Sequence, residues 1–181
     1  MDQYTELQFL QSTASDLDVI FSFYDDAIAF QKTVFNKHWQ GFDREMIERE
    51  ISGGRQWKII KNGRIACIFE VEFSDPLIWG AKDNDPAIYL HRIVSHSSFR
   101  GSNFVTHIIE WAHGFANVKA KKFIRMDTWG DNPNLIAYYV KTGFKHVGFR
   151  FPEKSPLLPK HYEGTELALF ELPVNQDASW K

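Results

Sequence analysis

The sequence lacks a second cysteine, so Cys67 cannot form an internal disulfide and has no partner for a thiolate metal site. Cys67 lies in an apolar stretch, which favours a small core residue over a nucleophile. Long apolar runs are missing too, because no segment approaches the roughly 18 residues that a membrane span needs. Residues 1–4 lack the basic and apolar parts of a signal peptide. We therefore expect no membrane association and a reducing, cytoplasmic setting.

An excess of charge of one sign is also missing, since 21 Lys and Arg face 23 Asp and Glu. A net charge of −2 argues against a nucleic-acid partner bound through its phosphates. What the sequence does have is 44% hydrophobic residues, including 16 Phe and 6 Trp, which is enough for a sizeable core. We expect one domain over residues 1–173 and a C-terminal tail over 174–181 that frays after Pro173.

The N-terminal half reads as a strand, two helices and a hairpin. Residues 5–10 fit a short strand, and Ser15 is the expected N-cap of a helix with apolar residues at helical spacing. A second helix begins near Asp43 and ends at Gly53 and Gly54. Strands over residues 57–60 and 65–73 flank Asn62-Gly63, a pair that suits a type I′ turn. Residues 74–86 form an expected loop by their Pro, Gly and Asp content.

The C-terminal half alternates strands with helices. Strands are expected over residues 87–95, 123–127, 144–151 and 165–172. A helix follows Gly101, and a second begins at Asn132-Pro133 and ends at Gly143. Residues 152–164 form a Pro-rich loop. This order predicts a mixed α/β fold, with a mostly antiparallel sheet of about seven strands flanked by about four helices.

Residues 90–105 carry the first functional signal, a strand that enters a short polar loop and then opens a helix. The first amides of that helix, from Gly101 to Val105, have no partners within it and suit a pyrophosphate. Gly101 allows close approach of an anion to the backbone, and Arg100 adds a cation.

The second signal lies downstream, where Asn132 caps a helix that carries Ala137 and Tyr139 and is followed by Gly143 and Phe144. The two motifs together resemble those of the GNAT N-acetyltransferases, and the resemblance covers residues 88–151 well. It implies the GNAT fold and transfer of an acetyl group from acetyl-CoA to a primary amine by direct attack. The implied acceptor is a small-molecule or peptide amine, and homodimer formation is left open.

The resemblance also implies roles for individual residues. The backbone of the fourth strand pairs with the pantetheine arm, and the loop and Asn132 contact the coenzyme. The implied coenzyme-binding residues are Ile93, Val94, Ser95, Arg100, Gly101, Ser102, Asn103, Phe104, Val105, Asn132 and Tyr139. Tyr139 matches the family position that protonates the leaving thiolate.

The general base is less directly indicated. Some family members use a Glu in the fourth strand, at the position held here by Tyr89. His91 matches a histidine of the similar arylalkylamine acetyltransferases and is our candidate base, since neutral imidazole accepts protons near pH 7. Glu70 and Glu72 are alternatives. Asp127 is read either as a site for a cationic acceptor or as an exposed turn carboxylate.

Several features leave a second function open. Asn103 stands where the family usually has Gly, although Asn tolerates positive φ, and Val105 is bulky enough to narrow the pyrophosphate site. These departures and the missing Glu allow a non-catalytic sensor of acyl-CoA with the same fold. No metal is expected, because the three residues with metal-like spacing fit a solvated helix face. These are His107, Glu110 and His113. Aromatic residues that would line an acceptor pocket are Trp39, Trp79, His161 and Tyr162.

Overall fold

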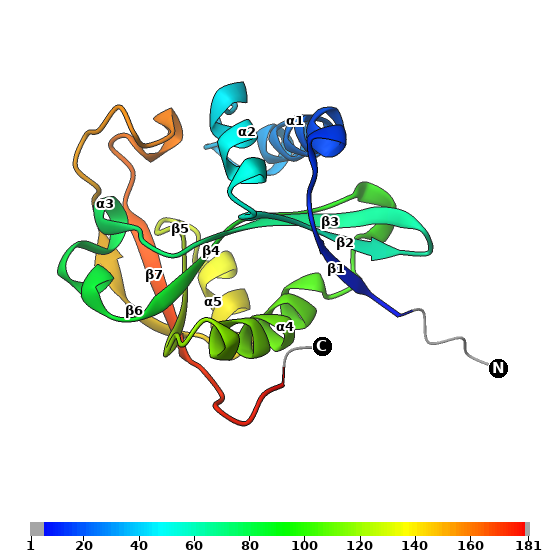
Figure 1. Ribbon diagram of the computed structural model, residues 1–181. Coiled ribbons are helices and arrows are strands. Elements are labelled where there is room, and N and C mark those ends of the chain that lie inside the picture. Colours follow the sequence, from blue (N-terminus) through cyan, green and yellow to red (C-terminus); the bar gives the residue numbers. More distant parts are fainter. Residues whose placement is uncertain (1–5, 180–181) are drawn as a thin grey trace. The chain divides into compact units, whose positions relative to one another are not determined.

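The computed structural model describes residues 6–179, which form one mixed sheet and its helices (Figure 1). The strands are β1 (Gln8–Gln11), β2 (Gln56–Lys61), β3 (Arg64–Glu72), β4 (Ala87–Ser95), β5 (Phe123–Trp129), β6 (Lys145–Arg150) and β7 (Leu167–Pro173). The helices are α1 (Leu17–Val34), α2 (Arg44–Ser52), α3 (Pro76–Trp79), α4 (Phe104–Val118) and α5 (Pro133–Lys141). The strand order is β1-β2-β3-β4-β5-β7-β6; β4 pairs with β5 in parallel, and the pairs β1–β2, β2–β3, β5–β7 and β6–β7 are antiparallel. The predicted fold class is confirmed, with α3 as one short helix more than expected.

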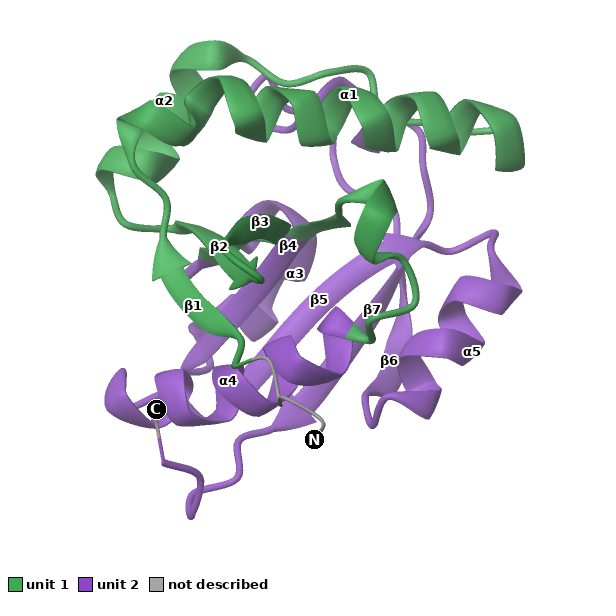
Figure 2. Cartoon of the chain, turned by 90° about the vertical axis from the view of Figure 1, so that its right-hand side faces the viewer, with its two compact units in different colours: residues 1–71, 92–103 green, residues 72–91, 104–181 purple. Residues whose placement is uncertain are grey.

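The chain divides into two compact units, drawn in different colours in Figure 2. The first unit comprises residues 1–71 and 92–103, and the second comprises residues 72–91 and 104–181. The boundary falls inside β4, between His91 and Arg92.

In the first unit, α1 and α2 bury apolar side chains against Ile68 of β3 and Val94 of β4. The chain enters α1 through a 3-10 turn capped by Thr13, so the predicted cap at Ser15 is wrong. Asp16 explains the difference, because its carboxylate accepts the Thr13 amide at 2.7 Å and lies 2.6 Å from Lys58 Nζ. The predicted cap of α2 is confirmed, since Asp43 accepts from the Met46 amide.

The predicted hairpin between β2 and β3 is also confirmed. Asn62 and Gly63 have φ angles of 54° and 71°, as a type I′ turn requires. Cys67 is fully buried in β3, and burial raises the pKa of its thiol to about 12, which fits a core residue rather than a nucleophile.

In the second unit, the segment predicted as loop 74–86 contains α3 and a 3-10 helix over Gly80–Asn84. Burial overrides its turn-rich composition: Ile78 and Trp79 are buried, and Trp79 packs against Tyr89 of β4. The helix predicted after Gly101 is α4, and the predicted caps of α5 are confirmed by the bond from the Leu135 amide to Asn132.

The tail is ordered beyond Pro173, against expectation. Val174 is buried, its amide donates to the Lys122 carbonyl, and Asn117 donates to the carbonyls of Asn175 and Ala178. One backbone hydrogen bond and two from the Asn117 side chain thus hold residues 174–178 to α4 and to the residues after it. Among residues 6–179, no helix combines the length and apolar character that crossing a membrane would take.

Candidate active site

The candidate site lies where the pairing between β4 and β5 ends. Parallel pairing joins Ala87 to Phe123 and continues to Tyr89 and Arg125, and we find no later pair between these strands in residues 6–179. His91 and Asp127 are the residues two positions further along each strand. Because side chains alternate along a strand, they project from the same face as Tyr89 and Arg125. The sheet register therefore brings His91 and Asp127 together.

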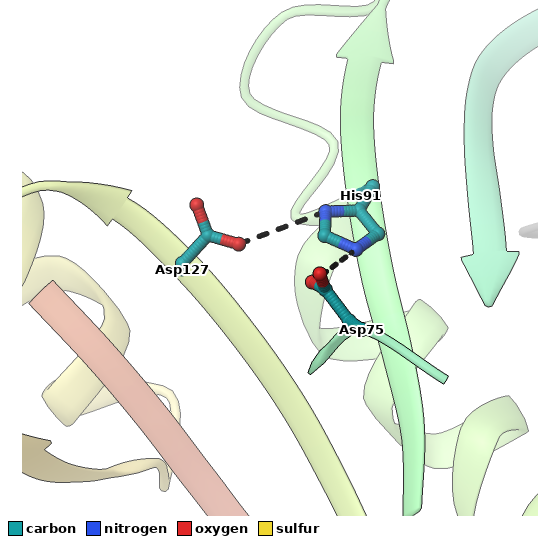
Figure 3. Close-up of side chains that lie close together, drawn as sticks. All are labelled: Asp75, His91 and Asp127. Atoms are coloured by element: carbon teal, nitrogen blue, oxygen red, sulfur yellow. Dashed lines mark ion pairs between the residues drawn. The ribbon is translucent and has the colours of Figure 1, made fainter. Parts of the chain in front are cut away.

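His91 lies between two carboxylates (Figure 3). Its Nε2 atom is 3.2 Å from Oδ2 of Asp75, and its Nδ1 atom is 3.7 Å from Oδ1 of Asp127. Asp75 comes from the segment that follows β3, where its backbone amide donates to the Asp83 carboxylate at 2.6 Å. The three side chains thus come from β4, β5 and the start of α3, all within the second unit.

The two carboxylates are short of hydrogen-bond donors. Oδ2 of Asp75 and Oδ1 of Asp127 are buried and have no hydrogen-bond partner within residues 6–179. The side chains are only 11% and 3% exposed, respectively. A buried carboxylate oxygen without a donor is costly unless a positive charge lies beside it. The site therefore favours a cation, either a protonated imidazole or the ammonium group of a ligand.

The pKa of Asp127 is raised to about 6, mainly by burial and also by the charge of Asp75, against the opposing effects of His91 and a hydrogen bond from Tyr162. The folded state then binds more protons than the unfolded state between about pH 4 and pH 6, so stability falls as pH rises through this range. At pH 7, the raised pKa of Asp127 lowers the free energy of unfolding by about 3 kcal/mol relative to a carboxyl with an ordinary pKa.

We expect Asp127→Asn to remove this penalty, so that the variant is more stable than wild type at pH 7.5 by up to about 3 kcal/mol. The difference should shrink as pH falls toward 4. Urea unfolding at several pH values measures it. Asp26→Asn, which changes an exposed carboxyl on α1, is the control and should show no such trend. Equal pH dependence of the two variants would contradict the assignment.

Tyr139 lies in the same unit as His91. It projects from α5, its ring packs against Phe170 of β7 at a centroid distance of 5.5 Å, and Tyr138 lies beside it. Burial raises the pKa of Tyr139, and the charges of Tyr138 and Asp127 raise it further. The phenol therefore keeps its proton at neutral pH and can donate it.

Two of the alternative residues have structural roles. The Tyr89 hydroxyl accepts from Arg125 Nη1 at 3.3 Å, and the ring is fully buried. Glu70 lies 3.0 Å from Arg92 Nη2, which also contacts Glu50. Glu70 is thereby held in an ion pair, which makes it a poor base. The ion pair between Glu70 and Arg92 was not predicted from the sequence. Arg92 has a φ of 48°, which interrupts the regular alternation of side chains between the two faces of β4.

The His91 cluster has the composition of a metal site, but its arrangement suits proton transfer better. One ligand atom from each of Asp75, His91 and Asp127 lies within 4.8 Å of the others. However, the imidazole stands between the carboxylates, with a different ring nitrogen facing each, whereas a metal ion binds one nitrogen. On α4, His107 is exposed beside Glu110 and His113 accepts from the Asn175 amide, as expected of a surface series.

The loop predicted to bind coenzyme has a backbone suited to an anion. Gly101 and Asn103 have φ angles of 82° and 53°, which confirms the expectation that Asn103 tolerates positive φ. Left-handed residues before a helix turn successive amides toward one concave surface. Arg100 is exposed, and its guanidinium lies 4.3 Å from the centre of the Phe30 ring.

The side chains of several other predicted coenzyme residues are engaged locally. Phe104 and Val105 are buried on the apolar face of α4, and Val94 belongs to the core of the first unit. The Ser95 hydroxyl lies 3.9 Å from the Cys67 sulfur. Asn132 caps α5. Ile93 and Ser102 are partly buried, and the predicted contact of these residues with a coenzyme stays a prediction.

A pocket of about 460 Å³ is lined by residues of the segment 153–163, among them Tyr162. Tyr162 lines this pocket and donates its hydroxyl hydrogen bond to Asp127. Trp39 packs against Tyr24 and Phe42 in the first unit, and its predicted role in an acceptor pocket stays a prediction.

The comparisons with known proteins address the fold. A GNAT-family acetyltransferase from Listeria monocytogenes superimposes with a TM-score of 0.75 and 22% identity, over 96% of this chain and 98% of that chain. A second GNAT-family acetyltransferase, from Streptococcus agalactiae, superimposes with a TM-score of 0.68 and 20% identity, over 95% of this chain and 98% of that chain. The chain has the fold of the GNAT N-acetyltransferases. The GNAT resemblance inferred from the two motifs is thus confirmed for the fold.

Sequence comparison adds a shorter match to the GNAT fold assignment. An uncharacterized N-acetyltransferase of Bacillus subtilis, YesJ, is 28% identical over 74 residues, which cover 41% of this chain and 41% of that protein. The match thus spans less than half of the relative's length. No protein-family model matches the chain.

Proposed function

We propose that the chain is an N-acetyltransferase that moves an acetyl group from acetyl-CoA directly to a primary amine. The observation that carries the proposal is His91 held between Asp75 and Asp127, with Tyr139 on a nearby helix, in a chain with the GNAT fold. Direct attack needs a neutral amine, a polarised carbonyl and a proton for the departing sulfur, and these residues supply the two proton transfers.

His91 takes the proton from the amine nitrogen. The acceptor enters this step as the neutral amine, and the two flanking carboxylates stabilise the positive charge that the imidazole then carries. The nitrogen–carbon bond forms as the carbon–sulfur bond breaks, and no covalent bond to the protein is needed.

Tyr139 gives its proton to the thiolate that leaves. Its pKa lies above the ordinary phenol value, so the phenol is protonated at neutral pH and has a proton available as negative charge develops on the sulfur. The phenolate is afterwards reprotonated from solvent, and His91 loses its extra proton, so that the cycle closes.

The coenzyme is held in this proposal by the turn before α4 and by the backbone of residues 93–95. The left-handed backbone at Gly101 and Asn103 supports this assignment, because left-handed residues turn neighbouring amides toward one concave surface, although the Ser102 amide itself donates to the Phe99 carbonyl. Val105 is buried on α4, which supports the proposal that its side chain does not narrow the turn.

The test is thiol release from acetyl-CoA with a panel of primary amines, using wild type and Tyr139→Phe. We expect turnover by wild type and a fall in kcat of about 10²-fold or more in the variant, with little change in KM for acetyl-CoA. Tyr138→Phe, which alters the exposed neighbouring phenol, is the matched control.

An unchanged kcat in Tyr139→Phe would remove Tyr139 from the mechanism. Tight binding of acetyl-CoA by calorimetry, without turnover of any amine, would overturn the transferase proposal and favour the non-catalytic sensor.

A further inference from the structure

A second pocket in the second unit is lined by two basic side chains, Lys82 and Arg150, that have no acidic partner among residues 6–179. It has a volume of about 310 Å³ and is lined by Trp79, Ala81, Lys82, Val147, Gly148, Phe149, Arg150 and Leu169. Ligand pockets of small molecules start at about this size. Neither Lys82 nor Arg150 forms a side-chain ion pair within residues 6–179.

Arg150 differs from the two other half-buried or buried arginines of the sheet. Arg92 contacts the carboxylates of Glu50 and Glu70, and Arg125 contacts those of Asp85 and Glu171. Arg150 has no carboxylate, and its Nε atom is buried without a hydrogen-bond partner among residues 6–179. Arg150 as a whole is only partly buried, so its guanidinium faces the pocket with one buried donor unsatisfied and no anion beside it, which points to an anion that is supplied from outside.

The fold makes room for this guanidinium. Gly80 has a φ of 55°, and a Cβ atom at that position would lie 2.7 Å from Nη1 of Arg150. The absence of a side chain at residue 80 therefore lets the Arg150 head group rest against the backbone. Gly148, which also lines the pocket, has a φ of 131° at an irregularity in the pairing of β6 with β7.

The sheet register aligns this pocket with the candidate active site. Asp127 of β5 is paired with Leu169 of β7, and Leu169 is paired with Gly148 of β6. Directly opposite residues project from the same face, so the pocket opens on the face that carries Asp127 and His91. Two strand spacings separate Asp127 from Gly148, which is about 10 Å.

We infer that the pocket binds an anionic group of the amine acceptor, a carboxylate or a phosphate. The guanidinium of Arg150 offers two parallel N–H donors to such a group, and Lys82 adds a second charge. The inference rests on the proposed acetyl transfer and narrows its substrate class to primary amines that carry an anionic group separated from the nitrogen by a chain of several carbons.

The experiment compares matched amines. We expect wild type to acetylate 8-aminooctanoate and 6-aminohexyl phosphate with a higher kcat/KM than the uncharged 8-aminooctanamide. Arg150→Gln should lower kcat/KM for the preferred anionic amine by about 10- to 100-fold and leave that for the amide unchanged. Lys82→Gln, at an exposed side chain, should act in the same direction. Lys145→Gln removes a charge from β6 outside the pocket, and it should change kcat/KM for neither the anionic amine nor the amide.

Calorimetry with 8-aminooctanoate and 6-aminohexyl phosphate, on protein saturated with coenzyme A, separates this inference from the proposed function. Binding to wild type that is lost in Arg150→Gln supports the anion site even if no amine is acetylated. Equal turnover of the acid, the phosphate and the amide by wild type overturns the anion site while acetyl transfer stands. Absence of binding by either anionic amine at millimolar concentration also overturns it.

Discussion

We expect His91→Gln to lower kcat/KM for the amine acceptor by about 10²- to 10⁴-fold, the usual contribution of a general base. Glutamine keeps a polar side chain of similar reach but cannot take the proton. The exchange also leaves Asp75 and Asp127 without the imidazole that now lies between them. Affinity for acetyl-CoA should not change, because the proposed role of His91 concerns the amine alone.

The pH profile provides a second readout of His91. In wild type, kcat/KM should fall as pH decreases below about 6, because protonation of Asp127 removes a charge that stabilises the imidazolium. This limb should disappear in His91→Gln. His107→Gln, at an exposed histidine of α4, is the control. Activity of His91→Gln within threefold of wild type would place the base elsewhere, with Glu72 as the remaining alternative from the sequence.

The largest expected effect on stability belongs to Arg125→Met. The Arg125 side chain is only 1% exposed, and its Nη2 atom lies 2.6 Å from Asp85 and 2.7 Å from Glu171. Its Nη1 atom donates to the Lys82 carbonyl, and the guanidinium lies over the Trp79 ring. One side chain thus joins β5 to β7 and to the segment after α3.

Removing one partner from a buried ion pair costs about 3–5 kcal/mol, because the remaining charges lose their compensation. We expect Arg125→Met to lose up to about 3 kcal/mol in urea unfolding, the lower end of that range, because the Asp85 side chain is 49% exposed and remains hydrated. Arg44→Met breaks only exposed ion pairs and should lose less than about 1 kcal/mol. A loss below 1 kcal/mol for Arg125→Met would show that solvent already screens the pairs.

Local patterns in the sequence determined most of the elements. Asn62-Gly63, the Asp43 and Asn132 caps and the strand over residues 87–95 are short-range signals, and each is confirmed. The predictions of a cap at Ser15 and of a loop over residues 74–86 are wrong, because tertiary contacts outweigh local preference there. Asp16 is held by Lys58, 42 residues away, and Trp79 is buried against Tyr89.

Only some residues of the candidate site could be predicted from the sequence. His91, Asp127 and Tyr139 were named from strand position and from family motifs, but no local signal marked Asp75 as a partner of His91. That partnership exists because Asp83 holds the segment before α3 in place. Likewise, Arg150 reads in the sequence as an ordinary strand cation. Only the register of β5, β7 and β6 aligns its pocket with Asp127.

By itself, the sequence determined the order of strands and helices and the two motifs typical of a GNAT fold, because hydrophobic period, caps and turns act over a few residues. The tertiary structure alone decided which charges are compensated. It paired Arg92 and Arg125 with two carboxylates each, left Arg150 with none, and buried two carboxylate oxygens beside His91. Compensation of charge depends on contacts between residues far apart in the chain, which no local pattern encodes.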